Sequence, residues 1–261
     1  MERVVVEGIM SVKRWKKLAV PALGFVLVVL LAGCSLDPQK GKIKYLESGK
    51  NFMKAGKYQE ASIQFRNSIK LDPRFAEAYY QLAQADLSLH QWNAAFTALQ
   101  QTIELDPQRM DAHLDTSRLY MGAHEYEKAE AEALTVIEKD PANLVAYKIL
   151  ASAQIDIKNF DEARKTFGKI LELDPNDPSG FVNLALVEIT LKDTSGAEQD
   201  LRKAIEIGPH FSPAYTELAK LLAWKHDAQG AGEVLERGVE SNPASSDLYI
   251  CLLYTSDAAD E

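Results

Sequence analysis

The apolar and small residues of the chain recur with a fixed period of 34 residues. A proline closes each period, at Pro73, Pro107, Pro141, Pro175, Pro209 and Pro243. With this proline set at position 32, the chain divides into six units, 42–75, 76–109, 110–143, 144–177, 178–211 and 212–245. Repetition of this kind is typical of a solenoid, in which each unit buries its apolar face against its neighbours.

Small residues occupy two fixed positions in every unit. Position 8 is Gly49, Ala83, Ser117, Ala151, Ala185 and Ala219, and position 20 is Ala61, Ala95, Ala129, Ala163, Ala197 and Ala231. This pattern predicts two antiparallel helices per unit, A at about positions 1–14 and B at about positions 15–31, which cross closely at the small residues. The Asp-Pro pair that follows ends helix B, because a residue before proline is disfavoured in a helix.

These columns resemble the tetratricopeptide repeat (TPR), which has an aromatic at position 4, Leu-Gly or Leu-Ala at 7–8, Ala at 20 and a large apolar residue at 24. The resemblance covers residues 42–245. It implies an all-α fold, a right-handed superhelical α-solenoid of stacked helix-turn-helix repeats. The third repeat departs most from the pattern, with His113, Thr116 and Ala133 in place of bulkier residues, so we expect looser packing there.

Residues 1–33 have the features of a signal peptide. A basic flank at Lys13–Lys17 precedes a 14-residue apolar run, Leu18–Leu31, which is shorter than the roughly 20 residues of a membrane-spanning helix. The run leads into Ala32-Gly33-Cys34, and this end resembles the lipobox of bacterial lipoproteins. The resemblance implies that Cys34 is lipidated, with palmitate or a similar acyl chain, and that residues 34–41 tether it to the first repeat. The alternative is an uncleaved membrane anchor with an incidental cysteine.

The residue after the cysteine bears on localisation. It is Ser35, not the aspartate that retains lipoproteins in the inner membrane of enteric bacteria. The resemblance therefore implies a lipid-anchored protein of the cell envelope, on the periplasmic face of the outer membrane. Translation could begin at Met1 or at Met10, which lies just before the basic flank.

The charge and the reactive residues narrow the class of partner. The net charge is −9, and because residues 1–33 carry +3, the rest of the chain carries −12, which disfavours nucleic acid. The two cysteines form no disulfide framework. The five histidines have no metal-ligand spacing, and no phosphate loop or nucleophile elbow occurs. The sequence therefore predicts no catalytic residue, no metal, no cofactor and no small-molecule substrate.

The resemblance also implies a partner-binding groove, because TPR proteins line their concave face with positions 2, 5, 9, 12 and 13 of helix A. We single out Lys50, Tyr80, Gln84, Leu87, Leu114, Arg118, Met121, Lys148 and Ile155, and the same columns continue through Leu186 and Trp224. An apolar track with interspersed cations suits an amphipathic or extended peptide. The carboxylate clamp of the chaperone-binding members is mostly missing. Alternatively, the track packs against a neighbouring turn of the superhelix.

A seventh repeat begins at residues 246–250, after which the pattern breaks off. Residues 251–261 resemble translated adapter from a sequencing library, which would make them a non-native tail. The alternative is a genuine short tail.

Together these features predict a membrane-anchored protein–protein interaction scaffold or adaptor that binds other envelope proteins or peptides. One alternative is a pilotin-like lipoprotein for assembly of type IV pilus secretins, which also has about six such repeats. Another is the N-terminal repeat region of a larger enzyme. A full-length gene with its neighbours would separate these hypotheses.

Overall fold

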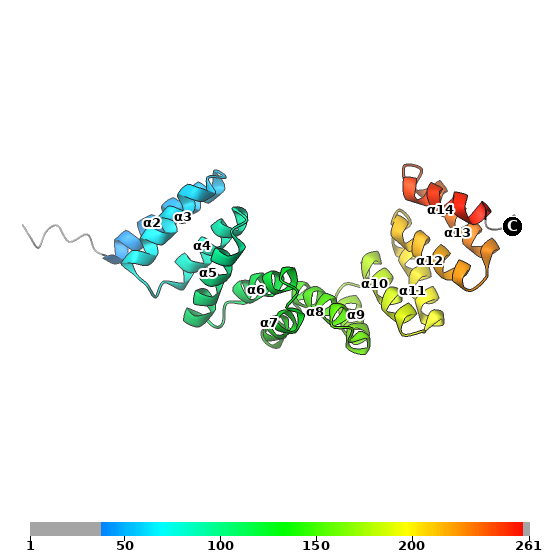
Figure 1. The fold of residues 1–261 in the computed structure, drawn as a ribbon, viewed down its shortest axis with the longest axis horizontal. Helices are drawn as coiled ribbons and strands as arrows, with labels where there is room; N and C mark the ends of the chain where they lie inside the picture. The colour runs from blue at the N-terminus through cyan, green and yellow to red at the C-terminus, as the bar shows by residue number, and fades with distance from the viewer. Residues whose placement is uncertain (1–37, 258–261) are drawn as a thin grey trace, which may run out of the picture. The chain divides into compact units, whose positions relative to one another are not determined.

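The computed structural model describes residues 38–257, so the predicted signal peptide, Cys34 and the last four residues lie outside the described part. Residues 38–257 form thirteen α-helices and no strand (Figure 1). The helices are α2 (Pro38–Lys54), α3 (Tyr58–Leu71), α4 (Ala76–Ser88), α5 (Trp92–Leu105), α6 (Met110–Gly122), α7 (Tyr126–Lys139), α8 (Leu144–Asp156), α9 (Phe160–Leu173), α10 (Pro178–Thr190), α11 (Thr194–Ile207), α12 (Ser212–Trp224), α13 (Ala228–Ser241) and α14 (Ser246–Asp257).

Helices α2 to α13 form six A–B hairpins, and α14 follows them. From the second repeat to the sixth, helix A covers positions 1–13 and helix B covers positions 17–30. The first helix differs, because α2 begins at Pro38, so residues 38–41 belong to a helix and not to the tether. Proline is tolerated in the first turn, where its missing N–H would have no partner in the helix. At the other end, α14 continues past residue 250 to Asp257.

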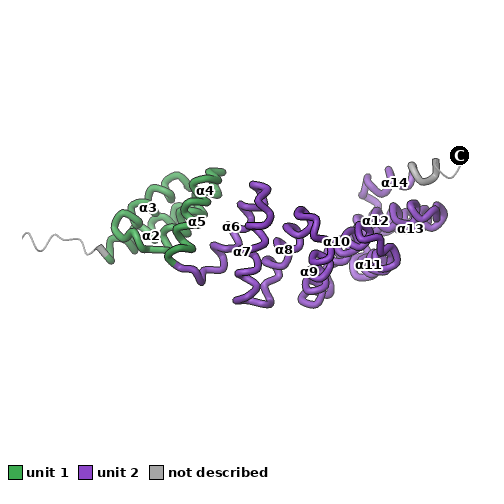
Figure 2. Tube along the Cα trace, turned by 60° about the horizontal axis from the view of Figure 1, so that its bottom comes forward, with its two compact units in different colours: residues 1–105 green, residues 106–261 purple. Residues whose placement is uncertain are grey.

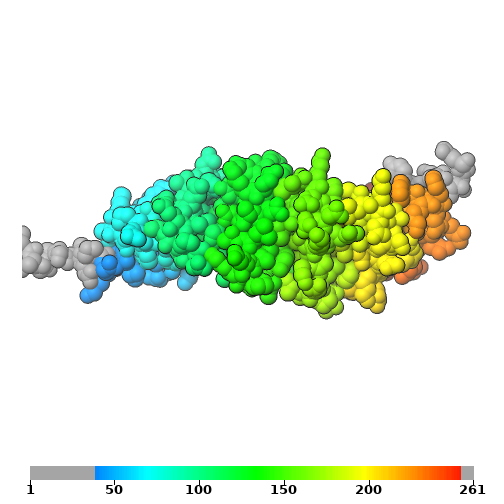
Figure 3. Space-filling model, turned by 90° about the horizontal axis from the view of Figure 1, so that it is seen from below, coloured from blue at the N-terminus to red at the C-terminus, as the bar shows by residue number. Residues whose placement is uncertain are grey.

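The chain divides into two compact units, residues 1–105 and 106–261 (Figure 2). In the first unit, helix B of one repeat packs against helix A of the next, through α3 and α4. In the second unit the same contact recurs between α7 and α8, α9 and α10, α11 and α12, and α13 and α14. Within the second unit, the face that Figure 3 shows is closed from one hairpin to the next. Each unit is thus an all-α stack of hairpins.

The alanines at position 20 are fully buried, with 0% exposure in all six repeats. The small residues at position 8 are buried beside them. Gly49 shows how close the approach is, because a Cβ added there would lie 2.4 Å from Cε1 of the Phe65 ring at position 24. This confirms that helices A and B cross where the sequence has its small residues.

The third repeat is as well buried as the others. His113, Thr116 and Ala133 all have exposures of 6% or less. The Oγ of Ser117, at position 8, donates a hydrogen bond of 2.6 Å to the carbonyl of Ala129, at position 20. This hydrogen bond joins helices A and B directly, whereas the buried Oγ1 of Thr116 has no hydrogen-bond partner within residues 38–257, so looser packing in this repeat stays a prediction.

His113 takes the place of the aromatic residue at position 4. Its Nε2 lies 3.1 Å from the carbonyl of Pro107, and its Nδ1 lies 2.5 Å from Oε2 of Glu132. In the sixth repeat, the Tyr215 hydroxyl donates a hydrogen bond of 3.0 Å to the carbonyl of Pro209, which is the equivalent proline. The histidine therefore keeps the polar contact of a tyrosine while filling less volume.

The proline at position 32, which follows Asp in four of the six repeats, builds the turn between repeats. In all six repeats the N–H of position 34 donates to the carbonyl of position 31, as Phe75 does to Asp72 over 3.1 Å. The Asp72 carboxylate also accepts from the N–H of Arg74, at 3.0 Å. Proline is favoured at the second position of such a turn, which explains its strict recurrence.

The turn between helices A and B has a left-handed residue at position 15 in every repeat. These residues are Gly56, His90, His124, Lys158, Lys192 and His226, with φ between 57° and 69°. In each case the N–H of position 16 donates to the carbonyl of position 11, as Asn159 does to Gln154 over 2.8 Å. This is the Schellman end of a helix, where glycine is the usual residue.

Glycine should therefore stabilise the turns that lack it. Lys158 is exposed and forms no ion pair, so Lys158→Gly removes left-handed strain without removing a contact. We expect it to raise the free energy of unfolding by about 1 kcal/mol. Gly56→Ala should lower it by a similar amount, since an added Cβ meets nothing within 4 Å and only strain is introduced. Urea denaturation measures both, and a loss of stability in Lys158→Gly would contradict the argument.

Candidate functional site

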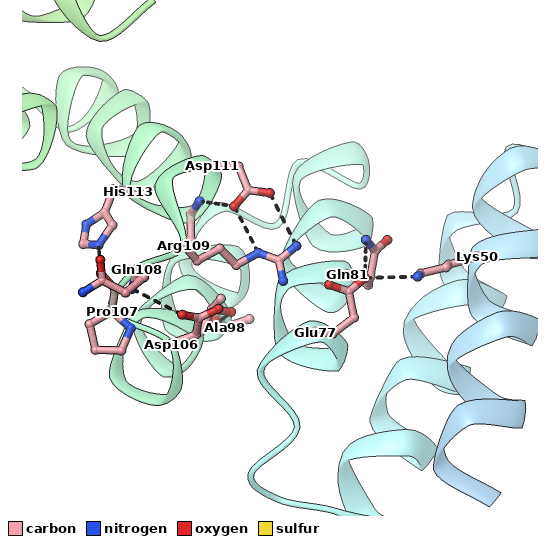
Figure 4. A network of polar contacts seen from close by, with 12 residues as sticks. Lys50, Glu77, Gln81, Ala98, Asp106, Pro107, Gln108, Arg109, Asp111 and His113 are labelled. Carbon is pink, nitrogen blue, oxygen red and sulfur yellow. Dashed lines mark hydrogen bonds and ion pairs between the residues drawn. The ribbon is translucent and has the colours of Figure 1, made fainter. Parts of the chain in front are cut away.

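In the first unit, the predicted groove residues lie half-buried on α2 and α4. They are Lys50, Tyr80, Gln84 and Leu87. The Lys50 Nζ lies 3.1 Å from Oε1 of Glu77, and Gln81 Nε2 donates to the same oxygen over 3.2 Å (Figure 4). Lys50 thus links the A helices of the first two repeats, and its charge is already balanced.

In the second unit, the predicted residues lie on α6 and α8, which contact each other. Leu114, Met121 and Ile155 are half-buried, whereas Arg118 and Lys148 are exposed. Both cations have acidic partners within the chain. Arg118 Nη1 lies 2.7 Å from Oδ1 of Asp115, and Lys148 Nζ lies 3.1 Å from Oδ2 of Asp177.

The same columns of helix A continue as exposed apolar side chains in the fifth and sixth repeats. Leu186 on α10 is 40% exposed and Trp224 on α12 is 67% exposed, and these two helices also contact each other. Aromatic residues are common at the centre of protein interfaces. We call this set, Leu114, Met121, Ile155, Leu186 and Trp224, the apolar A-helix track of the second unit.

Family models decide the class of protein. A model described as TPR repeat matches residues 49–89, and one described as Tetratricopeptide repeat matches residues 80–143 and 150–210. The chain belongs to the tetratricopeptide repeat family. Proteins of this family are generally interaction scaffolds without enzymatic activity. No curated protein matches the chain in sequence.

Solved TPR structures share the fold. The C-terminal part of a TPR repeat-containing protein from Cytophaga hutchinsonii has a TM-score of 0.71 at 17% identity, covering 87% of this chain and 92% of that one. PilF of Pseudomonas aeruginosa has a TM-score of 0.61 at 17% identity, covering 86% and 99%. YrrB, described as a TPR protein with an unusual peptide-binding site, has a TM-score of 0.61 at 16% identity, covering 74% and 97%. At these identities the likeness establishes the fold alone.

A column of buried polar residues at position 11 was missed by the sequence analysis. It comprises Asp86, Gln154 and Glu188 in the second, fourth and fifth repeats. Gln154 Nε2 donates to Oε1 of Glu130 on the preceding repeat over 3.1 Å, and its Oε1 accepts from Thr166 Oγ1 at 2.7 Å. A polar residue recurring at one helical position between apolar neighbours is the signal that would have found this column.

Asp86, like Gln154, contacts helix B of the preceding repeat. Its Oδ1 accepts a hydrogen bond of 3.4 Å from Ser62 Oγ and lies 3.6 Å from Nη2 of Arg66. Both residues lie on helix B of the first repeat. Burial raises the pKa of Asp86, and the Arg66 charge opposes that rise. Position 11 thus joins consecutive repeats by polar contacts inside an otherwise apolar interface.

Glu188 differs, because its Oε2 is buried and accepts no hydrogen bond within residues 38–257. Burial, together with the charges of Asp200 and Asp193, raises its pKa to about 7, and the charge of Arg164 opposes this rise. Burial also raises the pKa of Asp200. A raised carboxyl pKa can mark a catalytic acid. Glu188, however, is only 8% exposed and lies between packed helices.

The described helices have few features that suit a small ligand. No group of three or more His, Cys, Asp or Glu side chains within residues 38–257 is arranged to hold a metal ion. A hollow of about 390 Å³ between α11 and α13 is lined by Arg202, Glu206, Arg237 and Glu240, whose charges balance. Each helix within residues 38–257 is too short or too polar to cross a bilayer.

The Glu188 site predicts an unusual dependence of stability on pH. The folded chain keeps the Glu188 proton up to about pH 7, whereas the unfolded chain loses it near the ordinary pKa of 4.5. The stability from this site is therefore greatest below pH 4.5 and is lost as the pH rises through 7. Glu188→Gln should stabilise the protein at pH 8 by roughly 1–3 kcal/mol and have little effect at pH 4.

Thermal denaturation at both pH values measures this difference. The exposed Glu236 on α13 supplies the control, Glu236→Gln, which should shift the midpoint little at either pH. A Glu188→Gln variant with the same pH dependence as the wild type would contradict the assignment.

Proposed function

We propose that the protein is a membrane-anchored scaffold or adaptor of the bacterial cell envelope, which binds segments of partner proteins along its A helices. Membership of the TPR family and the stacked fold support protein or peptide partners in general. The apolar A-helix track of the second unit is the observation that carries the finer proposal. Single exposed apolar residues are ordinary, but here apolar residues recur at positions 5, 9, 12 and 13 of four successive A helices, and two of them, Leu186 and Trp224, are exposed.

The polar groups beside the track indicate what kind of segment fits. Arg118 and Lys148 are held by Asp115 and Asp177, so each cation meets a partner only by exchanging a carboxylate. Residues 106–261 carry 15 Lys and Arg against 29 Asp and Glu, a net charge of −14. Such a field speeds encounter with positively charged segments. The arrangement favours an amphipathic segment with apolar anchors and basic flanks over a free C-terminal carboxylate.

The groove part of the proposal predicts a loss of partner capture in one double variant. Leu186→Ala with Trp224→Ala should lower recovery in a crosslinking pull-down from intact envelopes several-fold, because both side chains are exposed on contacting A helices. Helical content by circular dichroism should stay unchanged.

The matched control is Leu134→Ala, an equally exposed leucine on helix B α7. If partner recovery is unaffected in the A-helix double variant but reduced in Leu134→Ala, the partner binds the B-helix face and the proposed groove is wrong.

The anchor part of the proposal rests on the basic flank, the apolar run and Ala32-Gly33-Cys34. Cys34 should incorporate labelled palmitate, and Cys34→Ser should not. Because two or more acyl chains hold a protein stably at a bilayer, the variant should also move from the membrane to the soluble fraction. Equal labelling of the wild type and the Cys34→Ser variant would contradict lipidation at Cys34. Separation of inner and outer membranes then tests the proposed position on the periplasmic face of the outer membrane.

A pilotin-like role is the second candidate, supported by the six repeats and the lipobox. Its test is secretin assembly. A strain lacking this protein would form fewer type IV pilus secretin multimers, and normal multimers in that strain would exclude the role.

A further inference from the structure

Helix α2, the first helix labelled in Figure 1, is far more basic than any other A helix within residues 38–257. It carries five lysines, whereas α6, α8 and α12 carry one Lys or Arg each and α4, α10 and α14 carry none. Lys57 follows directly after it. The surrounding unit shares the bias, because residues 38–105 have nine Lys and Arg against six Asp and Glu, a net charge of +3.

Most of these lysines are not used to hold the fold together. Lys42 is paired with Asp72, at 2.5 Å, and Lys50 with Glu77. The other four, Lys40, Lys44, Lys54 and Lys57, are exposed and pair with no carboxylate of the described residues. Lys40, Lys44 and Lys54 fall on one face of the helix, and the single acid on that face, Glu47, already lies near Lys50 at 3.7 Å. This set of four is the basic face of α2.

The basic face replaces a packing surface. Lys44 stands at position 3, which in the six later A helices is Ala78, Ala112, Ala146, Gly180, Ala214 and Leu248, all buried. Gly180 shows the usual contact, since an added Cβ would lie 2.9 Å from Leu171 on the preceding helix B. Packing a preceding hairpin in the same register would bury the Lys44 ammonium group, which is costly. A terminal repeat needs a polar outer face for solubility, but solubility alone does not require that the free charges be of one sign.

We propose that the basic face of α2 binds the anionic phospholipid headgroups of the membrane. The choice of this occupant rests on the lipid anchor proposed above. Pro38 follows Cys34 by four residues, which span at most about 14 Å, so an anchored chain holds α2 at the bilayer surface. Clustered lysines next to a lipid anchor are attracted to anionic lipids over about one Debye length.

The apolar side chains of α2 are compatible with this surface. Ile43 is 46% exposed and lies next to Lys44 at the edge of the basic face. An exposed apolar residue among lysines is typical of helices that lie in the interface between water and lipid. Binding through this face would orient the first hairpin with α2 against the bilayer.

Flotation with lipid vesicles tests the proposal apart from lipidation. The chain from Ser35 onward contains every described helix and lacks Cys34, so this assay stands even if Cys34 carries no lipid. It should bind vesicles of phosphatidylcholine with phosphatidylglycerol, bind phosphatidylcholine alone much less, and dissociate as salt is raised. The triple variant Lys40→Gln, Lys44→Gln and Lys54→Gln should bind at least ~10-fold more weakly with unchanged helical content.

The control is Lys165→Gln, Lys169→Gln and Lys203→Gln, which changes the net charge equally on the exposed B-helix surfaces of α9 and α11. This control should bind as the wild type does. Three results would overturn the proposal: equal binding by the α2 variant, equal loss in the control, or wild-type binding that does not depend on phosphatidylglycerol. Salt-sensitive self-association without vesicles, lost in the α2 variant, would likewise overturn it by assigning the face to the acidic unit of a second copy.

Discussion

The close crossing of helices A and B in each repeat is the contact on which the other features of the structure depend. It requires a small residue on both helices, and the fully buried alanines at position 20 meet the small residues at position 8 there. Because the backbones lie so near, position 24 fills the adjoining space, as Phe65 does over Gly49. The third repeat keeps the same distance with a hydrogen bond from Ser117 to Ala129. The hairpin therefore tolerates changes in the bulky columns more readily than changes in the small ones.

Between hairpins, a second kind of contact operates. The interface of helix B with the next helix A is apolar, but position 11 introduces a polar group into it. Gln154 bonds Glu130 of the preceding hairpin and Thr166 of its own hairpin, whereas Glu188, at the same position of the next repeat, faces a second acid, Asp200, of its own hairpin. Buried polar groups that are fully bonded fix the alignment of packed elements, whereas an unsatisfied one lowers stability. The fourth and fifth repeats thus place the satisfied and the strained form of one contact side by side.

The sequence predicted the repeat register, the helix pairs and the buried small columns, because each follows from a strict period of 34 and a size limit at the crossing. It did not predict the left-handed residues at position 15, since His90 and Lys158 carry no glycine signal there. The polar partners of His113, Glu132 and the Pro107 carbonyl, could not be predicted either, because they depend on how the chain folds around it. The start of α2 at Pro38 lies outside the periodic pattern. The residues of the groove columns could be named from the register, but their in-chain partners, such as Asp177 for Lys148, depend on folding.

Lys44 has a consequence for how such a gene can lengthen. Repeat proteins grow when a unit is duplicated, and a new hairpin must bury its face against an existing one. In the six later A helices, position 3 is a small or apolar residue, so a hairpin inserted in front of one of them packs against a compatible surface. In front of α2 it meets an unpaired charge, and burial of that charge would oppose assembly. Duplication is thereby disfavoured in front of α2, and the first hairpin keeps its place at the start of the stack whatever the number of repeats that follow it.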